Sequence, residues 1–350
     1  MTTKDEWLRK AREAHGRGDS AAEAAALDAL IRADRTNIAA LVAMAELKRR
    51  LNDERAASSF YRLALATAAQ ARDVHPALHP SLQRAEQYLS DVDNVLADHL
   101  FNRLRAAGLD QRTATPRVAE ALRLLSGEQR LYQQQPNMFY FPGLAQRAFF
   151  DRSEFDWVSE VETATAAIRD ELQALLNDPG EHFLPYVAAN PDRPPPNNPL
   201  LDKPDWGATW LWRSGEIASG MDRLCRQTLA ALARAPQPVI PGRAPIALFS
   251  RLKPGTHIAP HHGLLNTRLI CHLPLVVPDG CGIRVGAETR AWREGELMIF
   301  DDSFEHEAWN RGTSDRTVLL FEIWRPDIDT DERQQLTMLF SAIDAYDDGH

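Results

Sequence analysis

The spacing of hydrophobic and polar positions changes along this 350-residue chain. Residues 5–70 are rich in Ala, Leu, Glu and Arg, which indicates helices, and helical patterns continue to about residue 130. An extended aromatic stretch follows at 135–144, and helical spacing returns at 155–176. From 250 to 325 the apolar runs are of strand length and are separated by Gly, Pro and Asp turns. This order predicts a helical N-terminal part and a β-rich C-terminal part.

A repeat with a period of 34 residues is visible in the first helical part. Gly18-Asp19 aligns with Asn52-Asp53, and the small residue Ala11 aligns with Ala45. Small residues at fixed helical positions let antiparallel helices approach closely, as in tetratricopeptide repeats. We therefore predict about two tetratricopeptide-like repeats, and the alternative is an Ala-rich bundle with accidental periodicity.

Serine, proline and glycine mark further helix boundaries. Ser81 is a suitable N-cap for a long helix that ends near Gly108. Pro116 favours the start of another helix, which ends at Ser126-Gly127. The helical part is therefore expected to extend to about residue 130.

Prolines and apolar runs define the second part. Prolines recur too often in 185–204 for a regular element, so we expect a long loop over the mouth of a β-domain, as a lid or substrate wall. Residues 206–212 are expected to form a first strand and 331–344 a closing helix. The strands between them are centred on the Val, Ile and Leu clusters at 270–277, 297–300 and 318–323.

Short strands at close spacing suggest an antiparallel barrel or a double-sheet jelly roll. The predicted fold class is therefore α+β and multidomain. It comprises a tetratricopeptide-like helical domain at 1–130 and a double-stranded β-helix domain, jelly-roll or cupin-like, at 131–350.

Composition and charge indicate which partners and which cellular compartment to expect. The net charge of −9 argues against nucleic acid or an anionic membrane as the main partner. Three cysteines are too few and too scattered for a disulfide framework, and they fit a reducing compartment. The polar N-terminus has no apolar signal core, and no apolar run reaches membrane-spanning length. We expect a cytoplasmic protein without a nucleic-acid or membrane partner.

Five of the eleven histidines lie between residues 250 and 325. His261 and His306 are the candidate metal ligands, because neutral imidazoles on facing strands commonly hold first-row metals. The position two residues after His261 is Gly263, so the simple His-x-Asp/Glu pattern is absent. Either Asp301, Asp302 or Glu305 supplies a third ligand, or the metal keeps an extra water. On residue types alone the alternative is a pair of ordinary hydrogen-bonded histidines.

Arginines in the same stretch suit an anionic co-substrate. Arg316 starts a predicted buried strand, where a guanidinium is costly without an anion. It is suited to a bidentate salt bridge with a carboxylate, and Ser250, Arg268 and His272 could add hydrogen bonds. The alternative for Arg316 and Arg268 is an ordinary ion pair with Asp301, Glu305 or Glu322.

Residues 137–326 resemble the aspartyl/asparaginyl β-hydroxylase family. The resemblance rests on several phrases in the family's order: Phe141-Pro142-Gly143-Leu144, Leu211-Trp212, Arg251-Leu252-Lys253-Pro254-Gly255-Thr256-His257, Pro260-His261-x-Gly263, Glu288-Thr289-Arg290-x-Trp292 and Phe300-Asp301-Asp302-Ser303-Phe304-Glu305-His306-Glu307. Arg316, ten residues after His306, also fits. Family members carry tetratricopeptide-like segments before the oxygenase domain.

The resemblance implies a double-stranded β-helix that uses Fe(II), 2-oxoglutarate and O2. The family is similar in having glycine at the position of Gly263 and binding iron with two histidines, here His261 and His306, with waters completing the coordination. It further implies that Arg316 acts in catalysis and, with Ser250 and His272, holds the 2-oxoglutarate carboxylates. Trp212 and Arg268 would line the substrate side.

One residue departs from the family. Where the animal hydroxylases have a second arginine between Arg268 and His272, this chain has Ile270. That arginine contributes to carboxylate recognition, so Ile270 favours a smaller or less acidic substrate, or one anchored elsewhere.

Three functions remain open from the sequence. The first is a 2-oxoglutarate-dependent dioxygenase that hydroxylates an Asp/Asn-like group in a peptide or amino acid. The second is a hydroxylase of a small metabolite or lipid-linked acyl group, and the third is a non-catalytic interaction protein whose repeats bind a protein partner.

Overall fold

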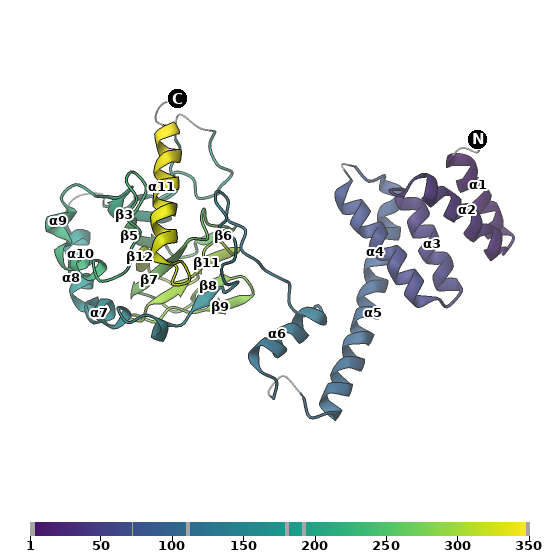
Figure 1. Ribbon diagram of the computed structural model, residues 1–350, viewed down its shortest axis with the longest axis horizontal. Coiled ribbons are helices and arrows are strands. Elements are labelled where there is room, and N and C mark those ends of the chain that lie inside the picture. Colours follow the sequence, from purple (N-terminus) through teal and green to yellow (C-terminus); the bar gives the residue numbers. More distant parts are fainter. Residues whose placement is uncertain (1–3, 72, 110–112, 179–181, 191–193, 348–350) are drawn as a thin grey trace. The chain divides into compact units, whose positions relative to one another are not determined.

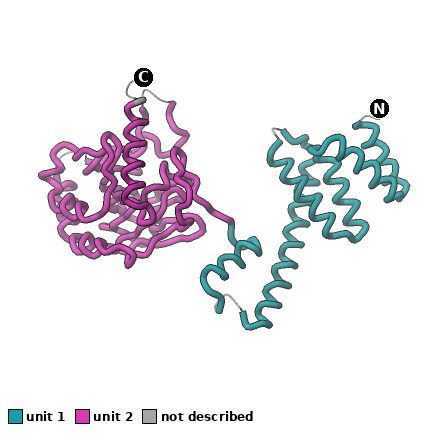
Figure 2. Tube along the Cα trace, viewed as in Figure 1, with its two compact units in different colours: residues 1–130 teal, residues 131–350 magenta. Residues whose placement is uncertain are grey.

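The computed structural model describes residues 4–71, 73–109, 113–178, 182–190 and 194–347. The chain divides into two compact units, Met1–Arg130 and Leu131–His350, which Figure 2 shows in different colours. Each unit has hydrophobic clusters of its own. None of the described helices is both long enough and apolar enough to cross a bilayer.

The first unit begins with two helix pairs. The helices are α1 (Lys4–Gly16), α2 (Ser20–Ala33), α3 (Ile38–Arg50) and α4 (Glu54–Gln70). The side chains of Asp19, Asn37 and Asp53 cap α2, α3 and α4 by accepting backbone N–H groups. α3 begins 34 residues after α1, and α4 begins 34 residues after α2. The predicted helices are confirmed, and the tetratricopeptide assignment stays a prediction.

Helix α5 (His79–Ala106) is longer than its predecessors and packs its N-terminal half on α4 through Leu82, Ala85 and Leu89. The prediction of Ser81 as N-cap is wrong, because the helix already begins at His79 with Leu78 at the cap position. Pro80 lies in the first turn, where its missing N–H costs no helical hydrogen bond.

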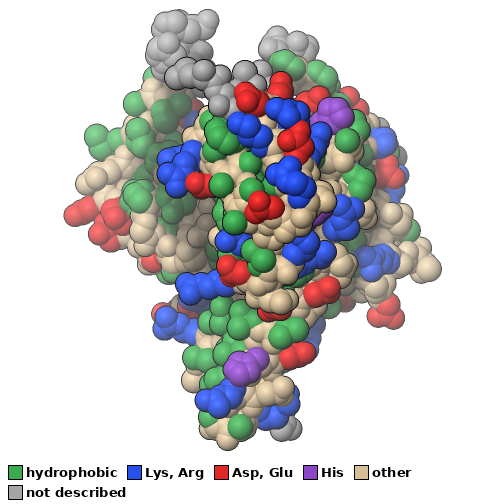
Figure 3. Space-filling view, turned by 90° about the vertical axis from the view of Figure 1, so that its right-hand side faces the viewer, with side chains coloured by type: hydrophobic (Ala, Val, Ile, Leu, Met, Phe, Trp, Pro, Cys, Tyr) green, Lys and Arg blue, Asp and Glu red, His purple; other side chains and the backbone are tan. Residues whose placement is uncertain are grey.

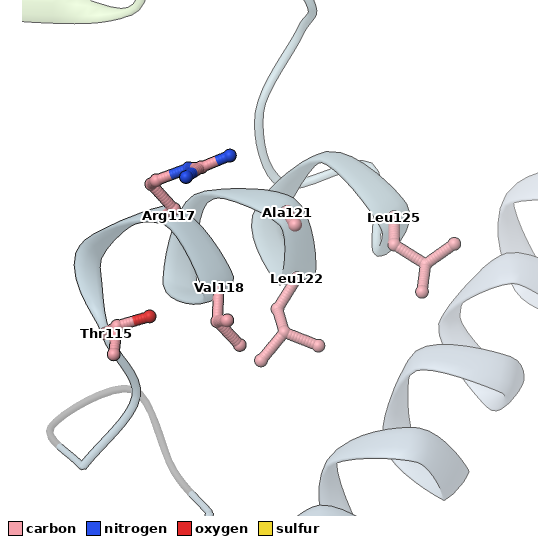
Figure 4. A pocket seen from close by; sticks show the side chains of 6 residues that line it. All are labelled: Thr115, Arg117, Val118, Ala121, Leu122 and Leu125. Atoms are coloured by element: carbon pink, nitrogen blue, oxygen red, sulfur yellow. The ribbon is translucent and has the colours of Figure 1, made fainter.

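Helix α6 (Pro116–Leu125) leaves an apolar face open. Figure 4 shows Val118, Leu122 and Leu125 along this face. Leu125 is 66% exposed, and the residues of the face line a pocket of about 450 Å³.

On the face of the molecule in Figure 3, Lys and Arg side chains are interspersed with Asp and Glu side chains.

The second unit is built on two antiparallel sheets. The larger has the order β1-β10-β7-β12-β5-β3-β2, with β4 on β3, and the smaller has the order β6-β11-β8-β9. Their bounds are β1 (Phe149–Phe150), β2 (Leu184–Pro185), β3 (Trp206–Arg213), β4 (Glu216–Ile217), β5 (Ala247–Leu252), β6 (His257–His261), β7 (Arg268–Val276), β8 (Cys281–Val285), β9 (Glu288–Arg290), β10 (Met298–Phe300), β11 (His306–Asn310) and β12 (Arg316–Trp324). From β5 to β12 the chain alternates between the sheets, as in a double-sheet jelly roll, except that β8 and β9 are consecutive strands of the smaller sheet and pair with each other.

Two apolar layers hold the sheets. Ile270, Ile283 and Phe300 belong to the cluster between the two sheets. On the outer face of the larger sheet, Cys271 and Phe321 pack against helices α7 (Val158–Thr163), α8 (Thr165–Asn177) and α10 (Arg226–Leu232), which lie to one side of the strands in Figure 1. Alternate residues of β7 thus face opposite layers.

The predicted elements of this unit are largely confirmed. The expected first strand is β3, the closing helix is α11 (Thr330–Asp347), and the helical pattern at 155–176 divides into α7 and α8. The short helix α9 (Met221–Leu224) precedes α10. Within 185–204 the described residues form turns beyond Pro185, and residues 191–193 lie outside the described part.

Candidate active site

His261 and His306 lie side by side on the smaller sheet. His261 ends β6, His306 begins β11, and the two are directly paired across the antiparallel ladder. The centroids of their rings are 4.1 Å apart. Strand pairing therefore places two imidazoles from distant parts of the sequence at one point.

The ring nitrogens of both histidines are oriented by the backbone. Nδ1 of His261 lies 2.8 Å from the carbonyl oxygen of Ala259, and Nδ1 of His306 lies 3.0 Å from that of Phe304. Since a carbonyl only accepts, each Nδ1 carries a proton, so in the neutral form of each ring Nε2 holds the lone pair. Histidine ligands of metals usually have this arrangement.

Burial keeps His306 uncharged. It lowers the pKa of His306 to about 3, and the neighbouring His261 adds to the decrease. A neutral imidazole is the form that binds a metal. Among the described residues no group of three or more His, Cys, Asp and Glu side chains could hold a metal ion, so a metal here would depend on the pair.

The carboxylate of Asp302 occupies the space beside Gly263. A Cβ on Gly263 would lie 2.2 Å from Asp302 Oδ2, closer than any side chain could tolerate. The backbone N–H of Gly263 also donates to the carbonyl of Asp302, at 2.6 Å. The opposite oxygen, Oδ1 of Asp302, is buried without a hydrogen-bond partner. With Asp302 in this position, residue 263 has no room for any side chain, including a carboxylate.

Arg316 is a buried guanidinium without an acidic partner among the described residues. It is 1% exposed, and its Nε and Nη1 atoms have no hydrogen-bond partner. Its guanidinium lies over the ring of Trp292, 4.6 Å from the centroid. Burial lowers the pKa of Arg316 to about 10, so the group stays charged at neutral pH. The alternative of an ordinary ion pair with Asp301, Glu305 or Glu322 is thus not formed, and the unused donors suit an anion.

His272 connects Arg316 to the histidine pair. Its ring lies 5.9 Å from that of Trp292 and 5.0 Å from that of Phe300, which in turn lies 6.1 Å from His306. Its Nδ1 is buried without a hydrogen-bond partner, and burial followed by the charge of Arg316 holds its pKa well below the usual value. The group is therefore neutral.

Ser250 lies on the inner face of β5, paired with Val318 of β12. Its hydroxyl accepts a hydrogen bond from Trp206 Nε1 at 3.2 Å. The ring of Trp206 in turn lies 6.4 Å from that of His261. Ser250 thus lies on the same side of the larger sheet as the apolar cluster around the histidines.

Arg268 is held by two carboxylates. Its Nη1 donates to Glu322 Oε2, and its Nη2 lies 3.6 Å from Asp302 Oδ2. Burial alone would lower the pKa of Arg268, but the two carboxylates raise it. The ion-pair interpretation that the sequence offered for Arg268 therefore describes its surroundings, although its Nε is buried without a hydrogen-bond partner.

Ile270 and an aromatic stack flank this ion pair. Ile270 is 5% exposed and belongs to the apolar cluster between the sheets. Tyr186 stacks on Trp206 with ring centroids 4.0 Å apart, and the ring of Trp210 lies parallel to it on the same cluster. Tyr186 comes from the proline-rich segment, which thus contributes to the wall beside His261.

Trp212 lies apart from the other predicted site residues. It packs on the cluster between the larger sheet and its helices, whereas Trp206 and Trp210 pack on the cluster between the sheets. An irregularity in the β3–β5 register between Trp210 and Trp212 changes the face of the later tryptophan. The sequence motif could not reveal this shift.

Several residues of the site carried no role in the sequence analysis. Trp292 stands in one of the phrases that carry the family resemblance, but no role was assigned to it. Tyr186 is placed by contacts with β3, and the local sequence gives no signal for it. Trp206 began a predicted strand, but its hydrogen bond to Ser250, 44 residues later in the chain, is visible only in the structure.

Comparison with known proteins finds relatives of the second unit. Residues 162–326 match the family model described as Aspartyl/Asparaginyl beta-hydroxylase. The aspartyl/asparaginyl beta-hydroxylase of Homo sapiens is 35% identical over 180 residues, which are 51% of this chain and 22% of that protein. The aspartate beta-hydroxylase domain-containing protein 2 of Homo sapiens is 30% identical over 212 residues, 59% of this chain and 55% of that protein.

A bacterial relative has a different named substrate. The ornithine lipid ester-linked acyl 2-hydroxylase of Rhizobium tropici is 34% identical over 180 residues, 51% of this chain and 60% of that protein. The matches thus span between 22% and 60% of the length of these three relatives. The matched residues contain both histidines, Arg316 and the strands that carry them. Over residues 162–326 this chain is thus similar to the aspartyl/asparaginyl β-hydroxylase family.

Proposed function

We propose that this protein is an Fe(II)- and 2-oxoglutarate-dependent dioxygenase that hydroxylates an unactivated carbon. The observation that carries the proposal is the pair His261 and His306, whose Nδ1 atoms donate to carbonyls and whose Nε2 atoms are left to bind a metal. When bound, Fe(II) and 2-oxoglutarate supply the O2-dependent oxidation, with succinate and CO2 as co-products.

The residues present fit both groups. Two imidazoles in their neutral form suit Fe(II), with waters as the remaining ligands. Asp302, whose Oδ1 lacks a hydrogen-bond partner, could accept a hydrogen bond from such a water. At the other end of the site, Arg316 supplies free buried donors for a carboxylate of 2-oxoglutarate, with His272 and Ser250 as further polar contacts.

The remaining residues exclude water from the site. Ile270, Phe300 and Trp206 belong to one buried cluster beside the histidines and Arg316. Removing water strengthens the salt bridge that Arg316 would form and protects the reaction from side products.

For the substrate, the family relation supports an Asp/Asn-like group in a peptide or amino acid. The alternative is an acyl group, which the Rhizobium relative's name and the buried Ile270 favour. The helical unit is a candidate site for a protein partner.

The test is succinate formation from 2-oxoglutarate by anaerobically purified protein that is then given Fe(II), O2 and a panel of peptides, amino acids and acyl compounds. We expect iron-dependent succinate, with one substrate class increasing its rate. Absence of both turnover and Fe(II) or 2-oxoglutarate binding would instead support a non-catalytic interaction protein.

A further inference from the structure

We infer that the group oxidised at this site is an uncharged aliphatic chain, such as an acyl chain or an aliphatic side chain, and not a carboxylate-bearing one. The inference rests on the proposed function and names its substrate class. It is carried by the juxtaposition of a compensated Arg268, the buried Ile270 and the aromatic stack of Tyr186, Trp206 and Trp210.

The first observation is the charge balance beside His261. Arg268 faces two carboxylates, Glu322 and Asp302, whose side chains are 2% and 10% exposed. Glu322 also accepts the backbone N–H of Ile246, so it is fixed in place. Because the charges of Fe(II) and of the 2-oxoglutarate dianion offset each other, a substrate carboxylate here would meet two negative side chains for one positive one. A buried anion without a counter-ion is strongly disfavoured.

The second observation concerns the neighbouring cations. Arg316 has free donors but lies beyond His272 and Trp292, where the proposed 2-oxoglutarate carboxylate would use them. Arg284 is held by Glu305 and Glu307. These guanidiniums are thus committed elsewhere, and a substrate anion beside His261 would not find its partner in them.

The third observation is the apolar wall. Ile270 lies between Arg268 and His272 on the inner face of β7 and is almost fully buried. Trp206 lies next to His261, and Tyr186 and Trp210 extend its ring surface. Apolar and aromatic side chains bind aliphatic carbon by excluding water from it. The apolar wall and the charge balance therefore both favour an uncharged aliphatic group.

The test compares probes that differ only in charge and polarity. Three otherwise identical pentapeptides carry Asp, Asn or Leu at the centre, and N-hexanoylglycinamide serves as an acyl probe. With the full-length Fe(II)-loaded protein, we expect the Leu peptide or the acyl probe to increase succinate formation roughly tenfold more than the Asp peptide. The hydroxylated product is identified by mass spectrometry.

Two variants should shift the substrate preference from the Leu peptide towards the Asp peptide. Ile270→Arg places a second cation opposite Glu322 and so balances the second carboxylate, and Glu322→Gln leaves Arg268 with one carboxylate fewer. Each should raise the ratio of Asp-peptide to Leu-peptide stimulation by roughly tenfold. Glu322→Gln keeps the shape of the side chain, so it remains informative if Ile270→Arg does not fold. The control Val276→Arg adds the same charge at the exposed end of β7 and should leave the ratio unchanged.

The outcomes separate this inference from the proposed function. Stimulation by the Asp or Asn peptide that equals or exceeds that by the uncharged aliphatic probes overturns the inference, and so does equal behaviour of all probes. In these cases succinate formation without added substrate still supports the dioxygenase. If the wild-type protein neither forms succinate without added substrate nor binds Fe(II), this result would contradict the proposed function itself.

Discussion

At the scale of single residues, the site depends on polar groups that lack the partners usual for buried atoms. Arg316, His272 and Asp302 all have buried atoms without a hydrogen bond among the described residues. Such groups destabilise a fold unless a ligand pairs with them, so they are typical of binding sites. Their effect on the free energy of unfolding and their effect on ligand affinity can be measured separately.

Arg316→Met tests this trade-off directly. Removing an uncompensated buried cation should raise the free energy of unfolding of the ligand-free protein by on the order of 1 kcal/mol. The same change should weaken 2-oxoglutarate binding roughly 10- to 100-fold, because a charge-assisted hydrogen bond is lost. Chemical denaturation and calorimetric titration of the Mn(II)-loaded protein measure the two effects. The exposed Arg311→Met is the matched control, and unchanged 2-oxoglutarate affinity in Arg316→Met would contradict the assigned role.

His306 gives the ligand-free protein a specific pH dependence. Its pKa is about 3 in the folded state, against about 6.5 when unfolded, so the unfolded chain binds more protons between these values. Stability therefore falls as the pH falls below about 6.5. Between pH 6.5 and 5.5 this group alone should lower the free energy of unfolding by about 1 kcal/mol.

Urea denaturation at the two pH values measures this contribution. His306→Asn should lack it, while the exposed His99→Asn should keep the slope of the wild type. Identical slopes in His306→Asn and the wild type would show that His306 is not neutral in the folded protein.

At the scale of elements, strand pairing brings the site together. The apolar runs predicted β7, β10 and β12, because buried strands form continuous hydrophobic stretches. The histidine pair was also predictable, since both residues lie in turn-bounded segments of one β-domain. The commitment of Arg268 to Glu322 and Asp302 was only one of two interpretations, and the positions of Tyr186 and Trp292 depend on contacts that no local pattern encodes.

The turn between β6 and β7 packs tightly against the turn before β11. Gly263→Ala should lower the free energy of unfolding by about 1–3 kcal/mol, because its Cβ would collide with the Asp302 carboxylate. In an Asp302→Ala background the same substitution should cost much less. A double-mutant cycle from urea denaturation measures the coupling, and strictly additive effects would argue against this contact.

At the scale of the whole molecule, the two units have separate hydrophobic clusters. Leu41 belongs to the helical unit and Leu319 to the layer between the larger sheet and its helices. We expect two thermal transitions, since each unit buries its own core. Leu41→Ala should lower one transition and Leu319→Ala the other, each losing about 2–5 kcal/mol. Scanning calorimetry measures this, and a single transition shifted by both variants would contradict independent unfolding.

The proposed iron and 2-oxoglutarate sites lie in only one of the two units. Every residue proposed to hold iron or 2-oxoglutarate lies in Leu131–His350. The helical unit has its own exposed features, including the apolar face of α6. Binding of cofactors should therefore respond to substitutions in the β-domain and be insensitive to those in the helical core.

The most direct test of the account is the visible charge-transfer absorption that Fe(II) and 2-oxoglutarate produce together under anaerobic conditions. We predict that the wild-type protein develops this band on titration with both, and that His261→Ala and His306→Ala do not. A band retained in both variants, or absent from the folded wild type at saturating Fe(II) and 2-oxoglutarate, would contradict the assignment of the two histidines as the iron site.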